Sequence, residues 1–173
     1  MERLWSPWRS AYMETFKKPK KAPRGRSVFT QALLARDDDR HYIVERGERC
    51  FTIMNLYPYN SGHLMVVPYR QVADLRDLTG EELAEMMDGV RRCMSALDEV
   101  MRPQGFNVGV NVGRAAGAGI DGHVHIHVVP RWNGDTNFMP VLGKTKVISE
   151  DMGKTLKSLR KALKKGSPAA RKR

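Results

Sequence analysis

GHVHIHVVP, at residues 122–130, is the most informative segment of this chain of 173 residues. Three histidines, His123, His125 and His127, stand at alternate positions, and apolar residues lie between and after them. Because alternate side chains of a β-strand share one face, the pattern predicts a strand with one apolar face toward the core and three imidazoles in a row on the other. Burying them would require partners for six ring nitrogens, so we interpret the row as a chemical site.

Two kinds of chemistry fit such a row of histidines. Zinc is one, because His-x-His is a common ligand pair, but a zinc site needs four ligands, or three and an open position, and neighbouring side chains on one strand rarely supply three. Phosphate chemistry is the other. The preceding segment, Gly113–Gly122, contains four glycines, which let backbone N–H groups approach an anion closely. By themselves these glycines fit a plain flexible loop equally well, but beside three histidines they favour a phosphate site.

The remaining sequence predicts an α+β fold with a single core, because a chain of this length usually holds one. Runs rich in aromatic and β-branched residues, separated by turn signals, indicate an antiparallel meander. Thr79 and Glu82 form a capping-box pattern ahead of a long amphipathic helix, whose Met-rich stripe, with Leu83 and Met87, is expected in the core or at a subunit interface. The expected strands are 41–47, 50–58, 62–69, 105–112 and 123–130, and the expected helices are 28–35, about 80–102 and 149–165.

The net charge of +11 is concentrated in two segments. Residues 17–26 carry six Lys or Arg, residues 154–173 carry nine, and neither segment contains a carboxylate. The rest of the chain therefore has fifteen basic residues against 19 acidic residues. We interpret the two segments as a solvated linker and tail rather than as a dedicated nucleic-acid site, although nucleic-acid binding through them stays possible.

Cysteine content and hydropathy restrict the class of protein further. Cys93 lies on the apolar stripe of the long helix and is expected to be buried, whereas Cys50 opens a strand; their spacing fits neither a metal site nor a disulfide scaffold. No apolar run approaches the roughly 18 to 20 residues of a membrane span, and the first ten residues lack the pattern of a secretory signal. We therefore expect a cytoplasmic protein without a membrane partner.

With these motifs in place, the sequence resembles the histidine triad (HIT) superfamily, whose hallmark is His-φ-His-φ-His-φ-φ with φ apolar. His123 to Val129 match this hallmark completely, and NLYPYNSGH at 55–63 is similar to a second family signature. The resemblance extends from about Val28 to Ile148. The segments LWSPWRSAY, NVGRAAGAGI and PRWNGDTNFMP are most similar to the bacterial branch that includes diadenosine tetraphosphate phosphorylases.

The resemblance implies roles for ten residues and needs no cofactor. His125 would be the nucleophile that attacks phosphorus and is briefly nucleotidylated, His127 would neutralise the phosphate oxygens, and His123 or His63 would orient the nucleophile or relay a proton. The implied nucleotide-binding residues are Asn55 for the ribose, Val28 and Phe29 for the base, and Asn111, Gly117 and Gly119 for the phosphates. We also expect a backbone carbonyl to orient the second ring nitrogen of His125.

One departure from the family pattern concerns a metal. Many bacterial relatives hold a structural zinc with Cys-x-x-Cys, a histidine after a VPYR-like segment, and a triad histidine. The corresponding positions here are Ser27, Thr30 and Gln71, and no nearby cysteine replaces the missing ligands. Because zinc requires thiolate or imidazole donors, we predict no structural metal.

The function implied by the resemblance is a nucleotidyl transferase or hydrolase acting on dinucleoside polyphosphates, as a phosphorylase or hydrolase. A nucleoside phosphoramidate hydrolase, or a nucleotide- or nucleic-acid-binding module with weak activity, is the alternative. Arg131, Lys144 or Lys146 could recruit an anionic acceptor. We expect a segment with Trp5 and Trp8 and a basic linker at 1–26, a HIT-like catalytic domain at 27–150, and a C-terminal helix and basic tail at 151–173. The Trp pair and the long helix also suggest a homodimer.

Overall fold

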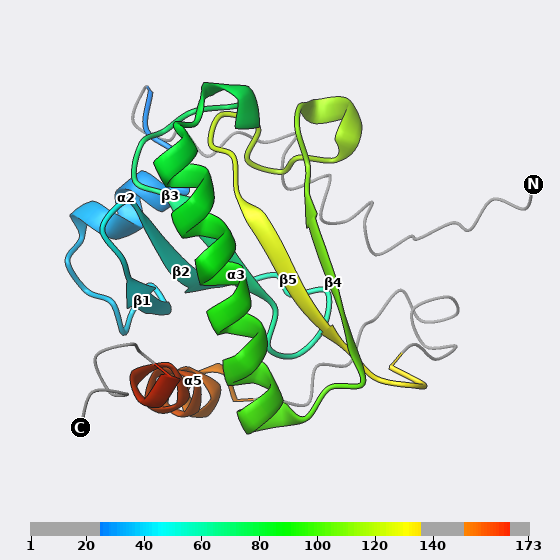
Figure 1. The fold of residues 1–173 in the computed structure, drawn as a ribbon. Coiled ribbons are helices and arrows are strands. Elements are labelled where there is room, and N and C mark those ends of the chain that lie inside the picture. The colour runs from blue at the N-terminus through cyan, green and yellow to red at the C-terminus, as the bar shows by residue number, and fades with distance from the viewer. Residues whose placement is uncertain (1–24, 136–150, 167–173) are drawn as a thin grey trace, which may run out of the picture.

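Five antiparallel strands form one sheet in the order β1-β2-β3-β5-β4, and helices cover both of its faces (Figure 1). The structure is a computed structural model that describes residues 25–135 and 151–166. The strands are β1 (Ile43–Arg46), β2 (Cys50–Met54), β3 (Leu64–Pro68), β4 (Gly105–Val110) and β5 (Ile126–Arg131). The helices are α2 (Val28–Leu34), α3 (Gly80–Met101) and α5 (Met152–Gly166), with short 3-10 turns at Leu75–Asp77 and Arg114–Ala116.

The α+β architecture predicted from the sequence is confirmed, but the histidine strand is shorter than expected. Strand β5 begins at Ile126, so His123 and His125 precede the strand and only His127 lies within it. Pro68, at the end of β3, has no N–H group with which to extend the ladder. The N–H of Val124 bonds to the carbonyl of Val72 instead, at 2.7 Å.

Helices α3 and α5 pack on one face of the sheet (Figure 1). Helix α3 begins with the predicted capping box, in which Thr79 and Glu82 bond to each other's backbone N–H groups. It lies so close to the sheet that a Cβ on Gly89 would be 3.1 Å from Val66. The fully or almost fully buried residues of this face include Leu64, Val66, Met86, Val90, Cys93, Leu97, Val128, Leu156, Leu159 and Leu163.

The side chains of α3 and α5 follow the sequence-based predictions only in part. Cys93 is fully buried as predicted, and burial raises its pKa to about 12. Leu83 and Met87 do not lie in the core, because their exposed fractions are 36% and 51%, and the alternative place expected for them, a subunit interface, stays a prediction. The basic residues 154–165 are not part of a loose tail, because α5 buries its apolar stripe against α3 and holds them on its outer side.

Helix α2 packs on the opposite face of the sheet. Phe29 and Ala32 are buried there against a second apolar cluster that includes Phe51, Met65 and Val67. The ring of Phe29 also contacts the imidazoles of the histidine segment, so α2 lies on the face that carries the candidate site. Trp5, Trp8 and residues 17–24 of the basic linker lie outside the described residues. Within the described part of the chain, no helix is both long and apolar enough to cross a membrane.

Candidate active site

His125 is held in the form that a nucleophile requires. Its Nδ1 lies 2.9 Å from the main-chain carbonyl of His123. A carbonyl oxygen only accepts, so Nδ1 carries the proton and Nε2 keeps its lone pair. The side chain is 4% exposed, and burial lowers its pKa below the ordinary value for histidine. The expected carbonyl contact is therefore present, and the imidazole is unprotonated at neutral pH.

His123 lies behind the site rather than at its surface. Its Nε2 donates to the carbonyl of Pro68 at 2.8 Å, so Nδ1 accepts, and Ser27 Oγ lies 2.6 Å from Nδ1. The side chain is fully buried, and burial lowers its pKa as well. A buried imidazole with both nitrogens occupied cannot touch a substrate, so of the two roles expected for His123 the geometry favours orientation of His125 over relay of a proton.

His63 and His127 form a hydrogen-bonded pair beside His125. The backbone N–H of Tyr59 donates to Nδ1 of His63 at 3.1 Å, which leaves the proton of His63 on Nε2. That Nε2 lies 3.0 Å from Nδ1 of His127 and donates to it. The proton of His127 is then on Nε2, and its ring packs against that of His125 with centroids 4.7 Å apart. The hydrogen bond from His63 therefore fixes the tautomer of His127.

Two asparagines bracket this histidine pair. Asn111 Nδ2 lies 3.5 Å from Nε2 of His127, and a half-turn of the amide brings its oxygen to the position that accepts the histidine proton. Asn55 accepts from the N–H of Tyr57 at 2.9 Å, and its Nδ2 lies 3.3 Å from Nδ1 of His63. Asn55 therefore helps to orient His63, in addition to the ribose contact that the sequence predicts.

The glycine-rich loop contains a 3-10 turn. Gly113 and Gly117 have φ values of +77° and +84°, which residues other than glycine rarely adopt. The N–H of Gly117 bonds to the carbonyl of Arg114 at 2.9 Å, so it closes the turn instead of pointing to an anion. This does not support a direct phosphate contact by the N–H of Gly117. Gly119 is half-buried, and its predicted contact is not tested by these hydrogen bonds.

The two predicted base-contacting residues differ in exposure. Val28 is 54% exposed, whereas Phe29 is 2% exposed. The Phe29 ring lies edge-on to the imidazoles of His123 and His125, with centroids 5.5 Å and 5.0 Å apart. Val28 thus offers apolar surface to a base, while Phe29 supports the histidines from behind.

Ser27, Thr30, Gln71 and His123 lie together, as the proposed correspondence to a zinc site requires. Thr30 Oγ1 donates to Gln71 Oε1 at 3.0 Å and lies 3.1 Å from Ser27 Oγ. Hydroxyl and amide groups are poor zinc donors, and here they satisfy one another by hydrogen bonding. This donor set does not fit a zinc ion. Among residues 25–135 and 151–166, no group of three His, Cys, Asp or Glu side chains could hold a metal.

Sequence reasoning missed several residues around the site. The ring of Tyr59 lies near those of His63 and His127, with centroids 4.8 Å and 5.8 Å apart. Asp135 accepts from Asn60, Arg131 and the N–H of Trp132, which fixes the 55–62 loop against the end of β5. The aromatic loop was a usable signal, but the contact of Asn60 with Asp135, 75 residues away, had none.

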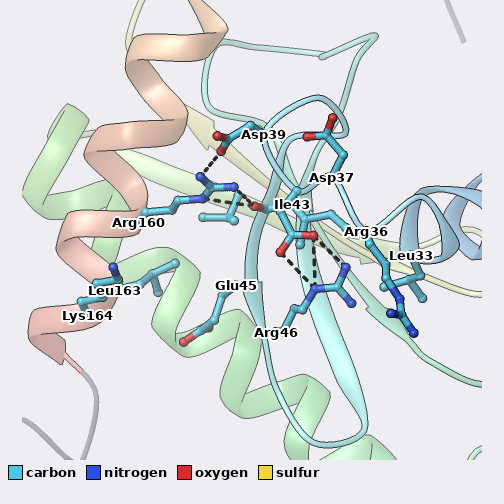
Figure 2. A pocket seen from close by; sticks show the side chains of 12 residues that line it. Leu33, Arg36, Asp37, Asp39, Ile43, Glu45, Arg46, Arg160, Leu163 and Lys164 are labelled. Carbon is cyan, nitrogen blue, oxygen red and sulfur yellow. Dashed lines mark hydrogen bonds and ion pairs between the residues drawn. The ribbon is translucent and has the colours of Figure 1, made fainter.

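The basic residues considered as anion sites are not confirmed. Arg131 bonds to Asp135 and to Asn107, so it is occupied in the structure. Lys144 and Lys146 lie outside the described residues. The cavity drawn in Figure 2 lies between β1 and α5, and none of its lining residues is a histidine.

Comparison with known proteins agrees with this geometry. The profile of the HIT domain matches residues 37–134. A protein named AP-4-A phosphorylase from Mycobacterium tuberculosis is 42% identical over 153 residues, covering 87% of this chain and 78% of that protein. A bis(5'-nucleosyl)-tetraphosphatase from Schizosaccharomyces pombe is 37% identical over 93 residues, covering 54% and 50%. The crystal structure of a zinc-bound histidine triad family protein from Mycobacterium smegmatis superposes with a TM-score of 0.67 and 29% identity, covering 82% of this chain and 96% of that chain.

Proposed function

The chain belongs to the HIT family, and on that premise we propose that it is a phosphorylase of dinucleoside polyphosphates such as diadenosine tetraphosphate. The observation that carries the proposal is the state of His125. Its Nδ1 proton is fixed by the carbonyl of His123, its Nε2 lone pair is available, and an N–H donor on His127 lies beside it. A neutral imidazole in this form attacks phosphorus without a separate base.

The first step of the proposed reaction forms a bond between Nε2 of His125 and the α-phosphorus of the substrate. The bond from that phosphorus to its bridging oxygen breaks, and ATP leaves from diadenosine tetraphosphate. The Nε2 proton of His127 stabilises the negative charge that develops on the phosphate oxygens. The product bound to the enzyme is adenylyl-His125, with the Nδ1 proton still held by the carbonyl of His123.

The second step transfers the adenylyl group to an acceptor. Inorganic phosphate attacks the α-phosphorus, the N–P bond breaks, and ADP forms while His125 regains its lone pair. Water at the same position would give AMP and make the enzyme a hydrolase. We favour phosphate because the relative named AP-4-A phosphorylase matches 87% of this chain, whereas the tetraphosphatase matches 54%.

Product analysis with and without inorganic phosphate tests the proposal. Wild type and His125→Ala are mixed with diadenosine tetraphosphate, and nucleotides are separated by chromatography while intact-mass spectrometry follows the protein. Wild type should release ADP and ATP only with phosphate and should gain one adenylyl group in the absence of phosphate. His125→Ala should do neither. His41→Ala, which changes a histidine that is not part of the site, is the matched control and should behave as wild type.

Each other outcome identifies a different function. AMP and ATP formed without phosphate would replace the phosphorylase by a hydrolase. Turnover of a nucleoside phosphoramidate, with none of diadenosine tetraphosphate, would favour the phosphoramidate hydrolase. Full turnover by His125→Ala would remove His125 as the nucleophile.

A homodimer is the second element of the proposal. In the described part of the chain β4 is the last strand of the sheet, and Val108 is 44% exposed on it. Leu83 and Met87 of α3 are also exposed apolar residues, and both an unpaired strand edge and exposed apolar surface favour association. Sedimentation velocity at micromolar concentration should give a dimer, and Val108→Lys should shift it toward monomer. A wild-type protein that is only monomeric would contradict this part.

A further inference from the structure

We propose that Ser27 is a positioning residue of the active site. Its hydroxyl fixes the ring of His123 and holds the start of α2 against the nucleophile His125. The inference rests on the proposed function for its kinetic consequence, but its structural content concerns the resting protein alone. It starts from the shortest polar contact of the buried histidine, the 2.6 Å between Ser27 Oγ and His123 Nδ1. These two residues are 96 positions apart in the chain.

The direction of each hydrogen bond in this cluster is determined. Because His123 Nε2–H donates to the carbonyl of Pro68, Nδ1 accepts and the Ser27 hydroxyl donates. Ser27 Oγ in turn accepts from the N–H of Thr30 at 3.1 Å, as the N-cap of α2. The hydroxyl of Ser27 is thus fully used, with its proton on His123 and its oxygen on the helix.

Gln71 ties the same corner of α2 to the segment after β3. Its Oε1 accepts from the N–H of Ser27 at 2.8 Å and from Thr30 Oγ1 at 3.0 Å, and its Nε2 donates to the carbonyl of Gly25 at 2.9 Å. The start of α2 is therefore fixed by five hydrogen bonds through Ser27 and Gln71. Loss of the Ser27 hydroxyl breaks two of them, the helix cap and the one that reaches the histidine segment.

Two routes connect this clamp to the nucleophile. His123 supplies the main-chain carbonyl that accepts the Nδ1 proton of His125, so the position of His123 sets the orientation of that ring. Phe29, two residues after Ser27 on α2, packs its buried ring edge-on against both imidazoles. Displacement of the start of α2 would move the support of His125 from both sides.

The cluster has the layout of a metal site without metal donors. A ligating histidine usually gives its second N–H to a backbone carbonyl, as His123 gives Nε2–H to Pro68. Ser27 and Thr30, however, present neutral hydroxyls, and Gln71 presents an amide. The observed hydrogen bonds take the mechanical role that a metal ion would otherwise have, which is to connect α2, the end of β3 and His123.

Three variants of Ser27 separate its two roles. Ser27→Ala loses both the hydroxyl donor and the helix cap, whereas glycine is tolerated at an N-cap almost as well as serine. Ser27→Gly therefore removes the donor to His123 and largely keeps the helix. Ser27→Thr retains the hydroxyl and should restore the wild-type behaviour. Thr79→Ala, which removes the N-cap of the distant helix α3, is the control for general loss of a cap.

The first readout is the ring ¹H–¹⁵N correlation spectrum of the histidines in the resting protein. In wild type and Ser27→Thr the Nδ1 signal of His123 should be that of a hydrogen-bonded acceptor, and in Ser27→Gly and Ser27→Ala it should move to that of a free lone pair. The second readout is turnover of diadenosine tetraphosphate with phosphate. Ser27→Gly should lower kcat about tenfold to hundredfold, the scale of a small displacement at a reacting centre, with a smaller change in KM.

Several outcomes would overturn the inference. Wild-type kcat in Ser27→Gly would do so, as would a His123 Nδ1 signal that does not change, or an effect of Ser27→Ala that Ser27→Gly does not share. If Ser27→Gly does not fold, Ser27→Cys, with its weak S–H donor, should give an intermediate Nδ1 signal and an intermediate kcat. If neither wild type nor any variant turns over the substrate, the proposed function has failed. The spectra would still show whether Ser27 fixes His123.

Discussion

His63 Nε2 lies 3.0 Å from His127 Nδ1, and this contact decides which ring nitrogen of His127 carries the proton. His63 can donate there because the N–H of Tyr59 occupies its other nitrogen. His127 is left with its proton on Nε2, next to His125. His63, which lies in a different segment from the three triad histidines, therefore determines the tautomer of His127.

Replacement of His63 should reduce catalysis more than substrate binding. In His63→Ala the ring of His127 loses its donor and can turn its lone pair toward the phosphate, which removes an oriented proton donor. We expect kcat to fall about 10²-fold or more, since a positioned donor contributes roughly 10² to 10⁴. Steady-state kinetics with diadenosine tetraphosphate and phosphate measure this. His63→Gln, whose amide can donate, should retain more activity than His63→Ala. An equal kcat in His63→Ala and wild type would show that His63 does not orient His127 for catalysis.

The acid limb of the pH profile should lie below the ordinary pKa of histidine. Burial lowers the pKa of His125, and only its unprotonated form is a nucleophile. More than half of the maximal activity should therefore remain at pH 6.5, and the acid limb should be centred on the lowered pKa. The pH dependence of kcat/KM measures that pKa in the free enzyme. An acid limb centred above pH 6.5 would contradict a buried, neutral His125.

Glu82 should make the protein sensitive to acid in a lower pH range. The hydrogen bond from Arg70, followed by that from the N–H of Thr79, lowers the pKa of Glu82 from 4.5 to about 2. A carboxylate whose pKa is depressed by folding stabilises the protein fully above pH 4.5, and this contribution is lost as the pH falls toward 2. The Tm of Glu82→Gln should be lower than that of wild type at pH 6, and the difference should shrink below pH 4.5. Asp98→Asn, at an exposed position of the same helix, is the control and should show no such loss of Tm.

Arg160 connects α5 to the first strand of the sheet. Its Nη2 and Nε donate to the carbonyl of Ile43 at 2.8 Å and 3.2 Å, and its Nη1 bonds to Asp39, as Figure 2 shows. Arg160→Ala should lower the free energy of unfolding by about 1 to 3 kcal/mol, because it leaves that carbonyl without its charged donor. Urea denaturation measures the change. Lys161→Ala, at an exposed position on α5, is the control, and an equal effect of both variants would show that the Ile43 contact contributes nothing.

The sequence was sufficient to predict those elements whose pattern repeats within a few neighbouring residues. Alternation of residues 123–129 predicted the two-faced segment, and Thr79 with Glu82 predicted the start of α3, because each pattern repeats over a few neighbouring residues. The meander was predictable for the same reason. The ends of the histidine strand were not, because Pro68 and Val72 from another segment terminate its pairing.

The fine structure of the site could not be predicted in the same way. The tautomer of His125 follows from a carbonyl two residues away and was expected, whereas that of His123 depends on the carbonyl of Pro68, 55 residues away. Leu83 and Met87 lie outside the core because a helical stripe of apolar residues can be wider than the face that the sheet covers. Such contacts depend on tertiary packing, which periodicity does not encode.

The basic C-terminus can be tested for nucleic-acid binding only by a truncation that keeps the whole of α5. Removal of residues 154–173 deletes Leu156, Leu159 and Leu163, which are at most 5% exposed in the core. Loss of a buried leucine costs about 2 to 5 kcal/mol, and three together exceed much of the roughly 5 to 15 kcal/mol that stabilises a domain. Truncation after Gly153 should therefore unfold the protein, as circular dichroism would show. Its loss of activity would say nothing about the role of the basic residues.

Truncation after Gly166 is the informative variant. It keeps the whole of α5 and removes Arg171, Lys172 and Arg173. We expect its turnover of diadenosine tetraphosphate to equal that of wild type, because the variant retains every residue that we place at the histidine site and the whole of α5. Fluorescence anisotropy with a single-stranded oligonucleotide at several salt concentrations measures the alternative function, since each phosphate contact steepens the salt dependence of binding. A full-length protein that binds tightly, with a salt slope that falls on truncation, would make the C-terminus a nucleic-acid site; unchanged weak binding with full turnover would leave the small nucleotide as the substrate.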